Sequence, residues 1–225
     1  MSFFAMTTGT GDVGIKIVGS VAGNVSTTDA QVHSLGNINV GSSDSDKNAI
    51  LTVSWFDAGG RTIITFTIGG VSLTEKVTAS AIGSNVLRSA IWAGDISSIS
   101  GSQAISVTFS SDVQSSGVSG VAVSNLESLT PTMSDTDSTI SGAQLTITNL
   151  AAQTGGIVVG GGASADFDAT ASWGSVTERS DVQTGGASGD HRHSAAWDLG
   201  RHAAANETLD FTGGDERLVV GAGFR

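Results

Sequence analysis

Two histidines, His191 and His193, stand two residues apart in this chain and are its clearest candidates for chemistry. In a strand, residues two apart share one face of the sheet, so both rings could reach the same ion. A zinc site would also need a third ligand held in tetrahedral geometry. The nearby candidates for that ligand are His202, Asp190 and Asp198.

The histidines belong to a sequence motif that occurs twice in the chain. VLRSAIWAGD (86–95) and HRHSAAWDLG (191–200) share the frame Ser-Ala-x-Trp, and 197 − 92 places their tryptophans 105 positions apart. The first copy has Leu87 and Arg88 near the positions of the two histidines. Because the first copy keeps the frame without a histidine, we predict a structural role for the frame and no metal site.

A calcium site is suggested by SDSDKNA (43–49), where Asp44, Asp46 and Asn48 alternate. An EF-hand would need Gly at its sixth position and Glu at its twelfth, and Ala49 and Trp55 stand there instead. The sequence therefore excludes an EF-hand. A looser oxygen-ligand site stays open beside the interpretation as a polar turn, either in this segment or at Asp135 and Asp137.

Motifs for catalysis are absent from the sequence. There is no G-x-S-x-G elbow, and GGIVVGGGAS (155–164) lacks the Lys-Ser/Thr of a phosphate loop. That glycine-rich run is typical of a buried strand in which backbones approach closely. Without cysteine, thiolate catalysis and Cys-ligated zinc are excluded. We expect no catalytic residues, no cofactor and no enzymatic activity.

Aromatic platforms for sugars are sparse as well. The chain has four tryptophans and no tyrosine. Two of the tryptophans, Trp92 and Trp197, occupy the repeated frame, which favours a shared structural role at the edge of a core.

The net charge of −11 limits the choice of partners. Nucleic-acid binding needs a positive footprint, and the 10 Lys and Arg residues form no cluster. An anionic membrane surface is disfavoured for the same reason, and no stretch approaches the roughly 18 apolar residues of a spanning helix. We expect neither nucleic acid nor membrane as a partner.

Short β-strands separated by Gly, Ser, Asn and Asp predict an all-β protein with little helix. In RTIITFTI (61–68) the alternation predicts a half-buried strand, with Ile64, Phe66 and Ile68 on its inner face. We expect a two-sheet, jelly-roll-like β-sandwich of about twelve strands with under about 10% helix.

The repeat sets the expected domain organisation. Residues 1–29 form an N-terminal arm and first strand, and residues 30–225 form a sandwich of related halves, about 30–125 and 140–225. The seam at 126–139 contains the only proline and predicts a linker or long connection. One domain with a shared core is favoured over two separate domains, and Trp92 should superpose on Trp197.

The N-terminal arm carries large apolar residues ahead of small flexible ones. Its first basic residue is Lys16, so the start of the chain is not typical of a secretory signal. Phe3, Phe4 and Met6 are the predicted assembly contact, on a neighbouring subunit or a larger particle. The alternative is that they pack back on their own domain.

The order of several motifs resembles a β-sandwich module rich in Gly, Ser and Thr. The motifs are NAILTVSW, ITFTIGGVSLTEKV, VLRSAIWAGD, SQAISVTFSS and GVAVSNLESLTP, followed by GIVVGGG, HRHSAAW and LVVGAGF. Such modules occur in bacteriophage structural proteins and in bacterial surface proteins. The resemblance covers about residues 30–225, implies a jelly-roll-like fold without catalysis, and carries over no site residue.

Together these features predict a virion structural protein of a tailed phage or phage-like particle, assembled in the host cytoplasm. Its expected place is as a capsid decoration protein or head fibre, with a tail fibre subunit ranked next. Other virion proteins and further copies of the chain are the expected partners, and host surface glycans are a further candidate. The alternative function is a carbohydrate-binding or adhesive module of a bacterial surface protein.

Overall fold

The chain folds into antiparallel β-sheets. The computed structural model describes residues 14–42, 46–57, 59–80, 86–140, 144–152, 155–185, 190–200, 202–213 and 216–225. Within these residues there are 17 strands in four sheets and no helix. The predicted all-β, sandwich-like fold is confirmed. The strands number 17 instead of about twelve, and the sheets four instead of two, because each half of the chain builds two sheets of its own.

The first half of the chain, β1 to β9, forms sheets A and B. Sheet A has the strand order β1 (Lys16–Ser26), β9 (Ser115–Ser124), β3 (Lys47–Asp57), β7 (Val86–Asp95) and β6 (Thr74–Ser80). Sheet B has the order β2 (Ala30–Asn39), β8 (Ser102–Val113), β4 (Ile63–Ile68) and β5 (Val71–Ser72).

The second half, β10 to β17, forms sheets C and D. Sheet C has the strand order β10 (Met133–Thr139), β17 (Arg217–Phe224), β12 (Ile157–Ser164), β15 (Arg192–Leu199) and β14 (Glu178–Gln183). Sheet D has the order β11 (Leu145–Ala152), β16 (His202–Phe211) and β13 (Ala171–Trp173).

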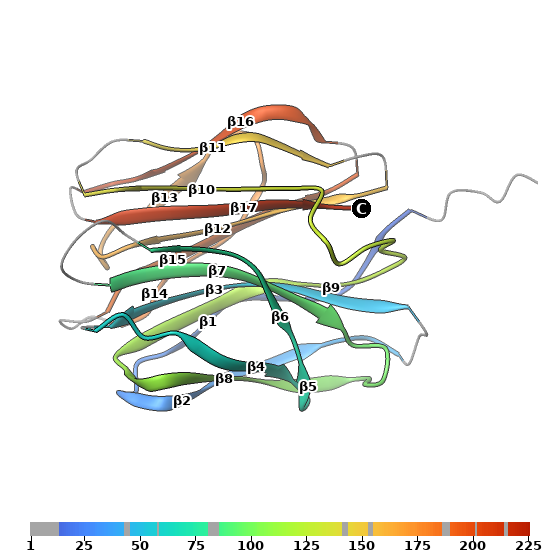
Figure 1. The fold of residues 1–225 in the computed structure, drawn as a ribbon, viewed down its shortest axis with the longest axis horizontal. Helices are drawn as coiled ribbons and strands as arrows, with labels where there is room; N and C mark the ends of the chain where they lie inside the picture. The colour runs from blue at the N-terminus through green and yellow to red at the C-terminus, as the bar shows by residue number, and fades with distance from the viewer. Residues whose placement is uncertain are drawn as a thin grey trace, which may run out of the picture.

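The four sheets stack face to face in the order B, A, C, D (Figure 1). Three apolar cores fill the three spaces. The first-half core lies between B and A and includes Leu35, Val53, Trp55, Phe66, Trp92 and Phe109. The A–C core includes Ile50, Leu87, Ile91, Val159, Trp197 and Phe224. The second-half core lies between C and D and includes Leu145, Ile147, Val158, Trp173, Leu209 and Phe211. Sheets A and C are therefore covered on both faces.

The two halves repeat one strand order. Sheet C follows sheet A strand for strand, and sheet D follows sheet B with one strand fewer. The predicted superposition of Trp92 on Trp197 is nevertheless wrong, although the two tryptophans lie on corresponding strands. Trp92 pairs with Leu51 and packs in the first-half core, whereas Trp197 pairs with Val159 and packs in the A–C core. Corresponding strands thus turn their tryptophans to opposite faces.

The predicted linker at 126–139 is only partly a connection. Its second part is β10, which pairs along its whole length with β17, from Met133 opposite Gly223 to Thr139 opposite Arg217. β10 is an edge strand, so one of its two backbone edges has no neighbouring strand. A strand of Ser, Thr and Asp lacks the apolar alternation by which strands are recognised in sequence.

The predicted alternation in β4 holds for Phe66 and Ile68, which are buried, but fails for Ile64. A register shift against β8 lies between Ile63 and Thr65. One extra residue in a strand reverses the faces on one side of the bulge. Ile64 therefore points outward and is 58% exposed.

Glycines in β12 let the sheets approach closely, as predicted from their run in the sequence. All of β12 is buried. A Cβ added at Gly160 would lie 2.6 Å from the ring of Trp173, and one at Gly161 would lie 2.8 Å from Cβ of Thr52. The two neighbours are in sheets D and A, so β12 allows close packing on both faces of sheet C.

Candidate functional site: a buried histidine and serine cluster

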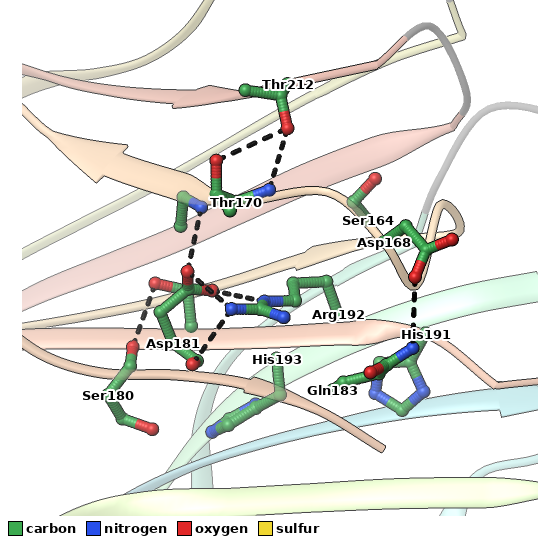
Figure 2. Close-up of polar contacts among 12 residues, drawn as sticks. Ser164, Asp168, Thr170, Ser180, Asp181, Gln183, His191, Arg192, His193 and Thr212 are labelled. Atoms are coloured by element: carbon green, nitrogen blue, oxygen red, sulfur yellow. Dashed lines mark hydrogen bonds and ion pairs between the residues drawn. The ribbon is translucent and has the colours of Figure 1, made fainter. Parts of the chain in front are cut away.

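The two candidate histidines lie at the start of β15 and face sheet A. His191 directly precedes the strand and His193 is its second residue. Figure 2 shows both rings pointing to one side of the strand, while Arg192 between them points to the other and pairs with Asp181. Because side chains alternate along a strand, the two histidines lie on one face and the Arg192–Asp181 ion pair lies on the other. The predicted sharing of one face by His191 and His193 is confirmed.

Ser54 of β3 joins the two rings across the space between the halves. Its Oγ lies 2.7 Å from Nε2 of His191 and 2.8 Å from Nδ1 of His193. The outer ring nitrogens also meet hydroxyl groups. Nδ1 of His191 lies 2.9 Å from Oγ of Ser115, and Nε2 of His193 lies 2.9 Å from Oγ of Ser119.

Thr184, which follows β14, completes this group. Its hydroxyl donates to the carbonyl of His191 and accepts from the backbone N–H of His191, both at 2.8 Å. Thr184 Oγ1 also lies 3.2 Å from Nδ1 of the same ring. We call these residues the histidine cluster: Ser54, Ser115, Ser119, Thr184, His191 and His193.

Strand β9 also binds a third histidine, on its opposite face. Nδ1 of His33 lies 2.6 Å from Oγ of Ser116, and Nε2 lies 3.1 Å from the carbonyl oxygens of Ala30 and Val113. Since carbonyls only accept, Nε2 of His33 carries the proton and Ser116 donates to Nδ1. Three of the four histidines in the chain are thus bonded to serines of one strand.

Burial keeps these rings neutral. His191 and His193 are both fully buried, and burial lowers the pKa of each to about 3 from an ordinary 6.5. The neighbouring His193 lowers the pKa of His191 further, and Asp181 opposes the shift of His193. Burial also lowers the pKa of His33, against the backbone acceptors Val113 and Ala30.

A serine between two imidazoles has the hydrogen-bond geometry of an activated nucleophile. Chemistry also requires that a substrate reach the nucleophile, and Ser54, His191 and His193 each have 0% exposure. In this conformation the cluster binds sheet C to sheet A and meets no solvent.

Metal binding has no support in the described part of the chain, where no three His, Asp or Glu side chains gather to hold an ion. The ring nitrogens of His191 and His193 point at hydroxyl groups. Of the proposed third ligands, Asp198 accepts from the backbone of Thr177 and pairs with Arg179 at the surface. The carboxylate of Asp190 lies against Gly185, and the side chain of His202 lies outside the described residues.

The acidic residues proposed for calcium have backbone partners. Asp135 accepts from the N–H groups of Thr136 and Thr148, and Asp137 accepts from those of Ser138 and Thr146. The bonds from Thr146 and Thr148 fasten β11 of sheet D to β10 of sheet C. In the segment 43–49, Nδ2 of Asn48 lies 3.5 Å from Oδ1 of Asp46. Asp44 lies outside the described residues.

The remaining predicted site residues are Phe3, Phe4 and Met6, and they too lie outside the described residues. The four tryptophans are all buried, with exposures of 1–9%, so none offers a face to a sugar. This agrees with the structural role predicted for Trp92 and Trp197.

Sequence reasoning found the two histidines but missed the hydroxyl residues that bind them. Ser54 and Ser119 lie 137 and 74 positions from their ring partners. The available signal was the presence of serines within predicted strands, in SWFD (54–57) and VQSSGVSG (113–120). A polar residue inside a buried strand indicates a partner, but not which one.

Among the described residues, no helix has the length and apolar character that crossing a membrane requires. Comparisons with protein families, with curated proteins and with solved structures find no match for this chain.

Proposed function

We propose that this chain is a structural subunit of a tailed-phage virion or phage-like particle, in which it serves as a capsid decoration protein or head fibre. A tail fibre subunit ranks next. The observation that carries the proposal is the burial of the histidine cluster. The residues best suited to chemistry are buried where they join the two halves of the molecule. This favours a protein that acts through its surface and its rigidity.

Two further features support a structural role. The four sheets pack through three apolar cores, and sheets A and C are covered on both faces. This arrangement suits a durable scaffold. The net charge of −11 favours solubility and disfavours contact with packaged nucleic acid. The origin in a virion rests on the resemblance of the strand motifs to modules of phage structural proteins.

The alternative from the sequence, a carbohydrate-binding or adhesive module, has less support. Aromatic side chains are the usual stacking platform in such sites, and all four tryptophans are inside the cores. Glycan binding through hydroxyl and amide groups is tested by the glycan array described next.

The test is quantitative mass spectrometry of purified particles from a host that carries this gene beside capsid genes. A copy number near that of the major capsid protein supports decoration, and a few copies per particle point to a fibre. Absence from the particles, together with binding of the free protein on a glycan array, would establish the adhesive alternative.

The predicted assembly contact is tested by deleting residues 1–8. We expect the truncated protein to keep its β-sheet circular dichroism and thermal transition but to fail to enter particles. Burying two phenylalanines is worth about 3–6 kcal/mol, enough to decide docking. A Phe3→Leu/Phe4→Leu variant is the matched control and should still assemble; normal incorporation of the truncated protein would refute the contact.

A further inference from the structure

The histidine cluster bridges the two halves of the molecule. Ser54, Ser115 and Ser119 belong to sheet A, whereas His191 and His193 belong to the second half. Their bonds cross the same space as the A–C core. The docking of the halves therefore rests on an apolar contact and, beside it, a hydrogen-bonded group that contains two titratable rings.

All hydrogen bonds of the cluster are satisfied when both rings are neutral. If Ser54 donates to Nε2 of His191, then Nδ1 of His193 donates to Ser54, and Ser119 donates to Nε2 of His193. Nδ1 of His191 then donates to Ser115. Reversing every donor gives the other consistent arrangement. In each arrangement the four ring nitrogens have a hydroxyl partner.

Protonation breaks this balance. If both rings carry two protons, both donate to Oγ of Ser54, and the hydroxyl proton of Ser54 has no ring left to accept it. The positive charges would also lie in a fully buried place, which is costly without a bonded counter-ion.

The charged groups near the cluster lie on the strands packed around it. Strands β9 and β12 contain no titratable residue. On β14, Asp181 pairs with Arg192 of β15 at 2.5 Å, and Glu178 and Arg179 lie earlier in the strand. Other charged residues on the elements packed against the cluster include Lys16 of β1, Lys47 and Asp57 of β3, Arg88 and Asp95 of β7, Asp190 before β15, and Asp198 near the end of β15.

Asp57, Asp181 and Asp198 have partners outside the cluster. Asp57 accepts from the backbone of Gly59 and Arg61, and Asp198 accepts from that of Thr177. The carboxylate of Asp190 lies against Gly185. The ring nitrogens keep their hydroxyl partners.

We propose that the histidine cluster makes the docking of the two halves dependent on pH, so that proton uptake by His191 and His193 loosens the A–C contact. Each half has its own apolar core between its own two sheets, so loosening between A and C does not require either half to unfold.

The direction follows from linkage. The rings have a folded-state pKa of about 3 and an ordinary value of 6.5, so the opened state binds more protons between these two values. Docking is fully stable above about pH 6.5 and is weakened progressively as the pH falls toward about 3. With two rings, the opening equilibrium constant rises by up to about 100-fold for each pH unit in that range.

The tryptophans provide a reporter for each core. Trp197 lies in the A–C core, Trp173 in the second-half core, and Trp55 and Trp92 in the first-half core. The experiment records tryptophan fluorescence of the full chain from pH 8 to pH 3, beside far-ultraviolet circular dichroism. Subtracting the spectra of Trp197→Phe isolates the signal of the A–C core, and Trp173→Phe is the matched control.

We expect the Trp197 signal to change between pH 6.5 and 3 before the circular dichroism changes. In His191→Asn/His193→Asn the asparagines retain a polar group near each Nδ1, and the midpoint should fall by at least about one pH unit, since two titrating groups are gone. The variant His33→Asn, with a buried histidine replaced inside the first half, should leave the Trp197 midpoint unchanged.

Equal midpoints in the wild type and the double variant, or a steady Trp197 signal down to pH 3, would overturn the proposal. If the double variant does not fold, histidine ¹⁵N and ¹³C resonances of the wild type decide. Rings that stay neutral until the Trp197 signal changes support the proposal, and rings that titrate near 6.5 while that signal is constant refute it.

Discussion

The first-half core and the A–C contact each join two sheets, but through different kinds of side chain. Between sheets B and A lies an apolar core, to which the bond between His33 and Ser116 is a polar addition. Between sheets A and C the apolar core is accompanied by six hydroxyl and imidazole residues that bond across the gap. Sheet A, which takes part in both, presents a different chemistry on each face.

The difference separates two kinds of stability. Apolar packing is non-directional, tolerates small shifts and varies little with pH. A buried polar group requires its partners in one geometry, because each unpaired donor or acceptor costs about 1–3 kcal/mol. We infer that the cores within the halves supply most of the folding free energy, and that the histidine cluster fixes how the halves meet.

The largest effect is expected from breaking the first-half core at Phe109. This side chain is fully buried, 5.8 Å from the ring of Trp55 and 5.1 Å from that of His33 between centroids. Phe109→Ala should lower the free energy of unfolding by about 3–5 kcal/mol through lost burial and a residual cavity. Urea denaturation followed by circular dichroism measures it.

Phe224→Ala is the matched truncation on the other side of sheet A. Phe224 is equally buried but belongs to the A–C core. Its loss should change the Trp197 fluorescence at lower urea than the circular dichroism, whereas Phe109→Ala should move both probes together. Coincident transitions in both variants would mean that the halves unfold as one unit and that the distinction between the two regions has no energetic basis.

The next effect is expected at the centre of the histidine cluster. Ser54→Ala removes the one hydroxyl that serves both rings, so a nitrogen of each loses its partner. The expected loss is about 1–3 kcal/mol in the free energy of unfolding at pH 8.

Ser116→Ala is the control for that variant, because it strips a single nitrogen of His33 inside the first half. It should cost less than Ser54→Ala and leave the Trp197 signal unaltered. A larger cost for Ser116→Ala would show that the polar bonds within the first half matter more than those between the halves.

The class of fold was predictable because short apolar runs and glycine-rich turns have a local cause. The buried β12 and the shared face of His191 and His193 follow from period and composition alone. The number of sheets was not predictable, since Thr52 and Ser54 look like outward-facing positions of a half-buried strand. In the structure these polar residues face sheet C, because sheet A is covered by sheet B on one face and by sheet C on the other.

The offset of the two tryptophans has a similar origin. The frame Ser-Ala-x-Trp is the same in both copies, but Trp92 pairs with Leu51 and faces the first-half core, whereas Trp197 pairs with Val159 and faces the A–C core. The edge strand β10 was not recognised in the sequence because it consists mainly of Ser, Thr and Asp and lacks apolar alternation, and its pairing with β17 cannot be read from local sequence. In each case the missing information is long-range pairing.

The smallest effect is expected from Thr52→Val, which sharpens the comparison within the A–C contact itself. Thr52 is fully buried, donates to the carbonyl of Ser119 at 3.2 Å and lies against Gly161. Valine keeps the shape; it loses a bond worth about 0.5–1.5 kcal/mol and gains a buried methyl worth about 0.8 kcal/mol. The free energy of unfolding should therefore change by no more than about 1 kcal/mol in either direction.

Gly161→Ala tests the same contact from the opposite sheet. An added Cβ there would lie 2.8 Å from Cβ of Thr52, which is closer than side chains pack, so about 1–3 kcal/mol should be lost to overpacking. Combining it with Thr52→Ser, which removes the opposing methyl, should recover part of that loss. If Thr52→Val proved as costly as Ser54→Ala, any buried hydroxyl of sheet A would matter equally, and the histidines would have no special part in joining the halves.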